Sequence, residues 1–279
     1  MHKFVSALAF AALALPVAVQ AGEETVMIKG SQRTIPATVT LPEGPGPFPF
    51  VVMYHGTGSN RHEAGNGYDL LAPKLAEAGI ASARFDFAGN GDSPVDYKEY
   101  TFSSGVADGQ DVIAYMRGLA QIDDARLGVL GWSQGGTIAM LTAGRHDDVR
   151  SVVTWAGALD MKGAFAELYP EAEKNGFAVM EFEWRTPLNL SLDWFKEARS
   201  TDVAAELANY KGAVLAIAGA NDDVVPPATT DAIVAAAGGD NKSKSIIDGA
   251  DHTFNIFSGD MSAFNTLIAQ TVDWFKATL

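Results

Sequence analysis

Short apolar runs alternate with longer amphipathic segments along most of the chain. Continuous apolar runs are typical of strands buried on both faces, whereas apolar residues spaced three and four apart predict helices. The expected strands are residues 50–54, 80–85, 126–130, 149–155, 213–218 and 243–248. The expected helices are residues 68–78, 106–119, 229–237 and 262–277, and a further helix follows residue 133. This order predicts an α/β fold with a mostly parallel central sheet and helices on both faces.

Two segments depart from the alternation. Residues 24–28 and 35–41 are expected to pair as a hairpin. Residues 157–210, after the sixth strand, are too long for an ordinary connection and carry their own aromatic side chains. We interpret them as a cap over a functional site, with a peripheral helical decoration as the alternative. The predicted domains are a core of residues 22–156 and 211–279 and a cap insertion of residues 157–210.

The first residues have the pattern of a secretory signal peptide. A basic start at Lys3 precedes the apolar residues 5–15, Pro16 interrupts them, and Ala21 is a small residue before a cleavage site. The apolar stretch is too short to span a bilayer comfortably. We therefore expect residues 1–21 to be removed and the mature protein to be exported, periplasmic or extracellular, without stable membrane association.

Composition argues against several classes of function. The 279 residues include no cysteine, which excludes disulfides, zinc–thiolate sites and thiol chemistry. No histidine cluster has the spacing of metal ligands, so we expect neither a metal nor another cofactor. A formal net charge of −14 with no basic run argues against a nucleic-acid partner. The expected partner is a small molecule, and the oligomeric state stays open.

The segment Gly131-Trp132-Ser133-Gln134-Gly135 lies between a predicted strand and a predicted helix. It fits G-x-S-x-G, the nucleophile elbow, in which glycines permit a sharp turn that exposes the serine above the sheet. The N-terminus of the following helix favours developing negative charge. A glycine-rich turn without catalytic function is the alternative interpretation. The flanking strand and helix favour Ser133 as a nucleophile.

A carboxylate and a histidine follow two later strands. Asp222 comes after the strand 213–218 and His252 after the strand 243–248, so both should reach the same sheet edge as Ser133. The order serine, aspartate, histidine matches one chain order of the catalytic triad. In that triad His252 moves the Ser133 proton, and Asp222 orients and stabilises the imidazole. Other candidates for the acid are Asp223, Asp160 and Asp251.

The loop after the strand 50–54 begins His55-Gly56-Thr57-Gly58. A glycine-rich turn lets a backbone N–H approach a ligand closely. In the G-x-S-x-G architecture one oxyanion donor comes from this loop and the other from the residue after the nucleophile. We therefore predict that the N–H groups of Thr57 and Gln134 bind the oxyanion. We expect His55 to brace the loop rather than to act as the base.

Five segments together resemble a known family, namely residues 55–58, 79–93, 131–136, 219–226 and 249–252. The pattern is similar to the α/β-hydrolases and, within them, to the cinnamoyl and feruloyl esterases of bacteria. The resemblance implies the α/β-hydrolase fold, an oxyanion donor at Thr57 and a triad acid at Asp222. Substrate choice in these enzymes depends on the cap, where residues 157–210 depart from the family pattern.

The triad and the resemblance together predict a serine hydrolase that cleaves carboxylic esters through an acyl-enzyme, with feruloyl or cinnamoyl esters as candidate substrates. Trp184, Trp194 and Phe195 of the cap could hold an aromatic acyl group, or they could form the cap's own core. An exported peptidase or amidase is a competing hypothesis, and a binding protein without catalysis is a third. A peptidase would need an acidic cap residue for the substrate amine, for which the candidates are Glu181, Glu183 and Asp193.

Overall fold

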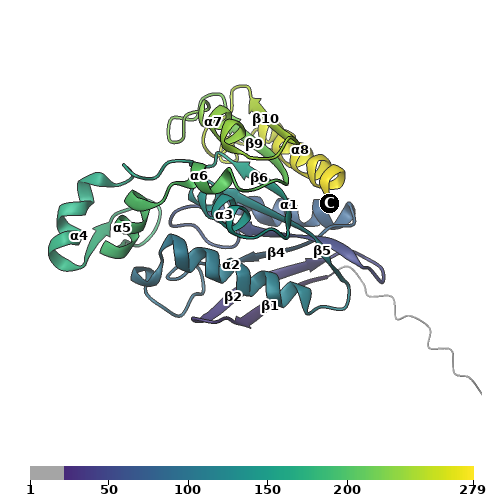
Figure 1. The fold of residues 1–279 in the computed structure, drawn as a ribbon, viewed down its shortest axis with the longest axis horizontal. Helices are drawn as coiled ribbons and strands as arrows, with labels where there is room; N and C mark the ends of the chain where they lie inside the picture. Colours follow the sequence, from purple (N-terminus) through teal and green to yellow (C-terminus); the bar gives the residue numbers. More distant parts are fainter. Residues whose placement is uncertain (1–21) are drawn as a thin grey trace, which may run out of the picture.

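The computed structural model describes residues 22–279, and the predicted signal peptide, residues 1–21, lies outside the described residues. Within the described part of the chain, no helix has both the length and the apolar character needed to cross a membrane. Most described residues belong to one layered unit, from which a smaller lobe projects (Figure 1).

A central sheet of eight strands organises the molecule, in the order β1-β2-β4-β3-β5-β6-β9-β10. Strand β2 runs antiparallel to both of its neighbours, and all other neighbouring strands are parallel. The predicted mostly parallel sheet is therefore confirmed. The strands are β1 (Gly22–Lys29), β2 (Thr34–Leu41), β3 (Phe48–Tyr54), β4 (Ala81–Phe85), β5 (Ile122–Trp132), β6 (Val149–Trp155), β9 (Ala213–Gly219) and β10 (Lys242–Ile247).

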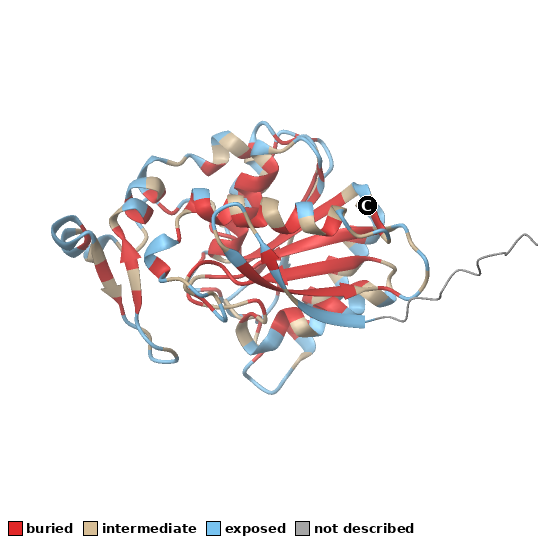
Figure 2. Cartoon of the chain, turned by 90° about the horizontal axis from the view of Figure 1, so that it is seen from below, coloured by how far each residue is buried: buried red, intermediate tan, exposed pale blue. Residues whose placement is uncertain are grey.

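Helices cover both faces of the sheet, as predicted. Alternate residues of β3 point to opposite faces, so Val52 and Tyr54 join one buried cluster while Val51 and Met53 join the other. This two-sided burial explains why the strand is a continuous apolar run, and the central strands are buried along their length in Figure 2. Helices α1 (Gly67–Glu77) and α8 (Ser262–Thr278) cover the second face, and α2 (Phe102–Arg117), α3 (Gln134–Arg145) and α7 (Thr229–Ala236) cover the first.

Helix α2 begins earlier than the apolar periodicity predicts. The prediction placed it at residues 106–119, but it spans Phe102–Arg117 because a capping box starts it. The Thr101 side chain accepts a hydrogen bond from the Ser104 N–H at 3.2 Å, and the Ser104 hydroxyl accepts one from the Thr101 N–H at 2.8 Å. Local hydrogen bonding at Thr101 and Ser104 therefore sets this end of the helix.

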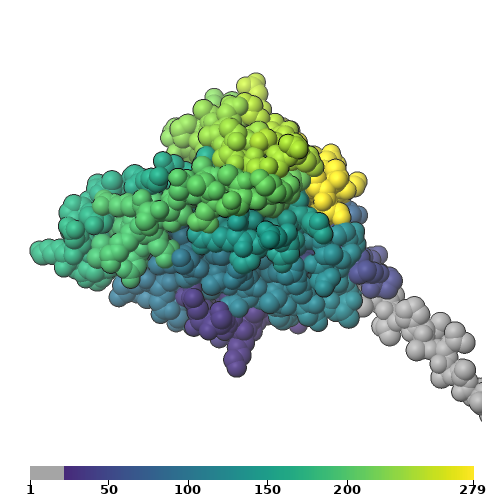
Figure 3. Space-filling view, viewed as in Figure 1, coloured from purple at the N-terminus to yellow at the C-terminus, as the bar shows by residue number. Residues whose placement is uncertain are grey.

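The chain between β6 and β9 forms the projecting lobe seen in Figures 1 and 3. It holds a two-stranded antiparallel sheet of its own, β7–β8, which the sequence analysis did not predict. Its elements are η3 (Ala166–Leu168), α4 (Tyr169–Asn175), β7 (Phe177–Met180), β8 (Leu188–Ser191), α5 (Leu192–Ser200) and α6 (Val203–Leu207). Two short 3₁₀-helices, η1 (Ala64–Asn66) and η2 (Tyr97–Glu99), belong to the larger layered unit.

Candidate active site

Ser133 occupies a sharp turn between β5 and α3. Its φ of 54° and ψ of −121° lie where L-residues are rarely found, so the surrounding packing must hold this conformation. The flanking glycines make the turn sterically accessible. A Cβ at Gly135 would lie 2.0 Å from the Tyr54 carbonyl oxygen, and one at Gly131 would lie 2.1 Å from the Gly135 carbonyl oxygen. The Ser133 N–H donates to the Trp155 carbonyl at 2.9 Å, which fixes the turn against β6.

The structure brings Asp222 and His252 together from the ends of β9 and β10. The Asp222 Oδ2 accepts a hydrogen bond from His252 Nδ1 at 2.8 Å, which leaves Nε2 free for proton transfer. The other carboxylate oxygen accepts from the N–H groups of Val224 and Val225 at 2.9 and 2.8 Å. The Asp222 side chain is fully buried, so its carboxylate oxygens are hydrogen-bonded to protein groups and not exposed to solvent.

The other acidic candidates have local roles. Asp251 accepts hydrogen bonds from the N–H groups of Thr253 and Asn255 at 2.8 and 3.0 Å, as expected of a turn residue. Asp160 accepts one from the Lys162 N–H at 2.9 Å. Neither bonds to His252, and Asp223 is exposed. Asp222 is therefore the carboxylate that orients the imidazole.

Two backbone donors lie beside the serine without acceptors. Within residues 22–279, the N–H groups of Thr57 and Gln134 donate no hydrogen bond. The loop that carries Thr57 passes close to Ser133, since a Cβ at Gly56 would lie 3.5 Å from the Ser133 Cβ. Unpaired donors at this position can bind the oxyanion that forms when a carbonyl is attacked.

His55 braces the oxyanion loop from behind. Its Nδ1–H donates to the Gly56 carbonyl at 2.8 Å, and its Nε2 accepts from the Phe87 N–H at 3.1 Å. The ring packs on Phe87 with a centroid distance of 4.5 Å. Burial lowers the pKa of His55 from 6.5 to about 4, so the ring is neutral at physiological pH. These contacts occupy both nitrogens and leave none for catalysis.

Glu63 is a site residue that the sequence analysis missed. It is buried, with a φ of 62°, and lies in a cavity wall together with Thr57 and His252. Its carboxylate accepts hydrogen bonds from the Gly56 N–H at 2.5 Å and from the Ala64 N–H at 2.8 Å. Burial raises the pKa of this carboxyl. No sequence pattern distinguishes Glu63 from an exposed acid in a polar loop.

A cavity of about 800 Å³ opens beside the triad. Its wall includes Ser133, Thr57 and His252. Most of the remaining wall is apolar, and Asp160 is the one acidic side chain among the described residues that line it. The principal apolar contributors are Leu159, Met161, Phe165, Trp184, Val225 and Pro226. The cavity can therefore receive an apolar or aromatic group next to the nucleophile.

Trp184 reaches this cavity from the turn between β7 and β8, with 65% of its surface exposed. The adjacent Arg185 anchors that turn to the core. Its guanidinium donates to the Gly58 carbonyl and, at 2.8 Å, to the Asn90 side-chain oxygen. These contacts join the tip of the lobe to the oxyanion loop and hold the indole over the site.

Trp194 and Phe195 do not line the cavity, and their prediction as substrate contacts needs correction. They are 0% and 1% exposed. The Trp194 ring packs against Phe102 of α2 and against Phe165, each at a centroid distance of 5.8 Å. Phe195 packs against Tyr169 at the same distance. The two side chains form the core that attaches the lobe to α2, which was the alternative interpretation.

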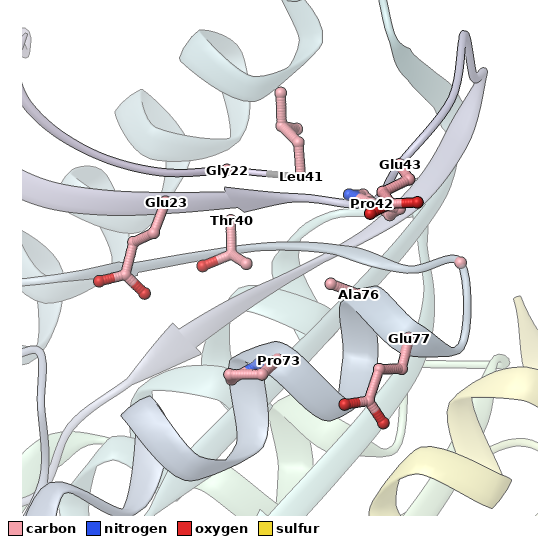
Figure 4. Close-up of a pocket in the computed structure, with 10 residues that line it drawn as sticks. Gly22, Glu23, Thr40, Leu41, Pro42, Glu43, Pro73, Ala76 and Glu77 are labelled. Atoms are coloured by element: carbon pink, nitrogen blue, oxygen red, sulfur yellow. The ribbon is translucent and has the colours of Figure 1, made fainter. Parts of the chain in front are cut away.

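Another hollow, of about 640 Å³, lies between β1, β2 and α1 (Figure 4). Glu23, Glu43 and Glu77 line it, and no member of the triad does. Glu23 already pairs with Arg84 at 2.8 Å. Among the described residues, no serine or histidine lines this hollow, so the candidate Ser133–His252–Asp222 site lies in the other cavity.

A model of the prolyl oligopeptidase family matches residues 67–279, which include Ser133, Asp222 and His252. The 2,6-dihydropseudooxynicotine hydrolase of Paenarthrobacter nicotinovorans is 31% identical over 133 residues, covering 46% of this chain and 33% of that protein. The pimeloyl-[acyl-carrier protein] methyl ester esterase of Neisseria meningitidis is 35% identical over 127 residues, covering 43% of this chain and 40% of that protein. The matches thus span well under half of these curated relatives.

Solved structures share the fold over nearly the whole chain. The structure of Est1E from Butyrivibrio proteoclasticus with ferulic acid bound has a TM-score of 0.73 at 18% identity and covers 91% of this chain and 98% of that chain. A dienelactone hydrolase of Anabaena variabilis has a TM-score of 0.66 at 18% identity and covers 94% and 100% of the two chains. At such identities the likeness shows the α/β-hydrolase fold and no more.

Proposed function

Because this chain is a hydrolase that belongs to the prolyl oligopeptidase family, we propose that it cleaves carboxylic esters through a covalent intermediate on Ser133. One observation supports this most directly. His252, which is paired with Asp222, lines the same mostly apolar cavity as Ser133 and Thr57, and the N–H groups of Thr57 and of Gln134, the residue after Ser133, are unpaired. That arrangement contains the parts that acyl transfer needs.

In the proposed reaction, Ser133 Oγ attacks the ester carbonyl while His252 Nε2 accepts its proton. The Thr57 and Gln134 N–H groups bind the negative oxygen of the tetrahedral intermediate. His252 then returns the proton to the leaving alcohol oxygen as the carbonyl carbon–oxygen bond breaks. Water, activated by the same histidine, releases the acid. Asp222 keeps Nδ1 protonated and stabilises the imidazolium in both halves of the cycle.

The acyl group is proposed to be aromatic. A planar aromatic acid offers surface to Trp184, Phe165 and Met161 in the cavity wall. Offset or edge-on ring contacts contribute about 0.5–1.5 kcal/mol beyond area burial. The polar end of a phenolic acid could donate to Asp160, the acidic group in that wall. Feruloyl and cinnamoyl esters are the substrates that combine these features.

The family match favours one competing function, a peptidase or amidase. Of the acidic cap residues considered for a substrate amine, Glu181, Glu183 and Asp193 do not line the cavity. Asp193 instead pairs with Lys196 at 2.9 Å. A substrate amine would have to pair with Asp160, which makes Asp160→Asn the variant that tests this alternative.

The decisive experiment measures hydrolysis by the wild type and by Ser133→Ala. The substrates are methyl ferulate, p-nitrophenyl acetate through decanoate, and an aminoacyl p-nitroanilide. We expect ester hydrolysis, with methyl ferulate among the substrates, and a fall of about 10⁴-fold or more in kcat for the variant. A fluorophosphonate probe should label the wild type and not the variant.

Three results would contradict the proposal in different ways. Anilide cleavage that depends on Asp160 and exceeds ester cleavage would assign a peptidase. Ester hydrolysis that survives in Ser133→Ala would place the nucleophile elsewhere. Absence of both turnover and probe labelling would leave a binding protein on a hydrolase scaffold.

A further inference from the structure

A second cavity, of about 640 Å³, is also lined by His252. It shares Thr57, Trp184 and His252 with the cavity beside Ser133, so both cavities meet at the reaction centre. Ser133 lines only the first of them. The two cavities therefore differ in which catalytic group they expose.

The walls of this second cavity are mainly apolar. Trp132 and Ala64 form part of its wall, and the exposed rings of Trp184 and Phe257 stand at its edge. Phe257 is 69% exposed and Trp184 65%, so both rings are accessible from solvent. A cavity edged by exposed aromatic rings is suited to bind an apolar group from solvent.

The one acidic group in this wall is already engaged. Glu63 directs its two carboxylate oxygens to the N–H groups of Gly56 and Ala64, at 2.5 and 2.8 Å. A cationic ligand would have to compete with these hydrogen bonds for the Glu63 carboxylate. The wall therefore favours an uncharged, apolar occupant.

We infer that the second cavity binds the alcohol portion of the ester and selects apolar alcohols, an inference that rests on the proposed function. Acylation bonds the carbonyl carbon to Ser133 Oγ, so the acyl chain extends into the cavity that Ser133 lines. The leaving oxygen must lie within reach of His252 Nε2, which gives it the proton taken from Ser133 as the carbon–oxygen bond breaks. His252 lines both cavities, and the acyl chain occupies the one that Ser133 lines, so the second cavity is the space left for the group on that oxygen.

The structure offers a matched pair of variants for the test. Ala64 lines the second cavity and Ala164 lines the first, and both are partly buried. Ala64→Leu and Ala164→Leu add the same bulk to opposite sides of the reaction centre. Each is measured with one alcohol series, the methyl, butyl, benzyl and choline esters of cinnamic acid. Each is also measured with one acyl series, the p-nitrophenyl esters from acetate to decanoate.

We expect the wild type to prefer the benzyl over the methyl ester by about tenfold or more in kcat/KM and to disfavour the choline ester. Ala64→Leu should lower the benzyl-to-methyl ratio by about tenfold and leave the decanoate-to-acetate ratio close to that of the wild type. Ala164→Leu should lower the decanoate-to-acetate ratio and leave the benzyl-to-methyl ratio close to that of the wild type. A benzyl-to-methyl ratio near one in the wild type, or an Ala64→Leu variant that alters the acyl ratio instead, would overturn the inference.

A binding measurement separates this inference from the proposed function. Trp132 lines the second cavity and not the first, so its fluorescence reports on the occupant of the second cavity, whereas Trp184 lines both. Benzyl alcohol should change the emission of Ser133→Ala saturably, and adding Ala64→Leu should abolish that change. Saturable binding without any ester hydrolysis would refute the proposed function and retain the cavity as an apolar site. Ester hydrolysis without saturable binding would refute the cavity assignment.

Discussion

Glu63 and His55 lie behind the reacting groups and hold the loop that carries Thr57. His55 donates to the Gly56 carbonyl, and Glu63 accepts from the Gly56 N–H. The carbonyl and the N–H of Gly56, the residue before Thr57, are therefore both hydrogen-bonded to buried side chains. Glu63 also has a positive φ, a conformation that costs about 1–3 kcal/mol and persists only where packing enforces it. Strain of this kind is found at sites where geometry has to be exact to a fraction of an ångström.

Glu63→Ala should lower kcat by about 10- to 100-fold with little change in KM, because the Thr57 N–H loses the support that aims it at the oxyanion. Glu63→Gln should lie between, since its amide oxygen can still accept from Gly56 while its amide nitrogen faces the Ala64 N–H. Steady-state kinetics on methyl ferulate measure both effects. Glu77→Ala is the control, because Glu77 is exposed and pairs with Lys74. A Glu63→Ala variant with wild-type kcat would refute this role.

His55 predicts a pH dependence of stability. Its pKa is about 4 in the folded protein and 6.5 when unperturbed, so the unfolded chain takes up the proton first as the pH falls. The stability that neutral His55 provides is complete above pH 6.5 and is lost between pH 6.5 and 4, by up to about 3 kcal/mol.

Urea unfolding of the wild type and of His55→Gln at several pH values measures this loss, because the other titrating groups cancel in the difference. The variant should be less stable than the wild type at pH 7, and the gap should narrow toward pH 4. A gap that is constant with pH would show that His55 is not buried in its neutral form.

At the scale of elements, backbone atoms pack closely around the glycines of the strand–turn–helix unit β5–α3. Gly135→Ala should destabilise the protein by about 3 kcal/mol or more, since its Cβ would meet the Tyr54 carbonyl oxygen at 2.0 Å and no flexible side chain can move aside. Gly163→Ala is the matched control, because a Cβ there meets no atom within 4 Å. Its effect should stay within about 1 kcal/mol.

Urea denaturation of the two glycine variants gives the comparison directly. Equal stabilities would mean that the turn relaxes when a methyl group is added. The steric argument for the glycines of the elbow would then fail, although the assignment of Ser133 as the nucleophile would not depend on it.

At the scale of the whole molecule, we propose that the chain is exported and cleaved after Ala21. Strand β1 begins at Gly22 and pairs with the end of β2 through Gly22 and Leu41, so the expected cleavage would leave the sheet intact. The acidic composition suits a protein that stays free of anionic surfaces.

Expression of the full chain in a bacterium tests this proposal through the intact mass of the exported protein, which should begin at Gly22. Ala21→Arg should block processing, because the position before the cleavage site requires a small residue, and Ala21→Ser should not. A mass that retains Met1, or an Ala21→Arg variant cleaved as efficiently as the wild type, would exclude a signal peptide of this length.

The sequence by itself determined the sheet, its helical layers and the candidate nucleophile, acid and base. These features have local causes. Burial on both faces makes a strand continuously apolar, the elbow requires glycines at fixed offsets around Ser133, and Asp222 and His252 each follow a strand end. Parallel strands carry such residues to one edge of the sheet, so their meeting could be predicted without coordinates.

Only the tertiary structure decided which remaining side chains belong to the site. The sequence does not distinguish between Trp184, Trp194 and Phe195, because an aromatic ring can pack in a protein core or contact a ligand equally well. Contact with Phe102 buries Trp194, whereas the anchoring of Arg185 to the oxyanion loop leaves Trp184 at the cavity. The role of Glu63 likewise cannot be predicted from its place in a polar loop, because it depends on the hydrogen bond to Gly56 that forms only in the folded chain. Whether each of these side chains belongs to the site therefore depends on packing between segments that are distant in the sequence, and not on residue type.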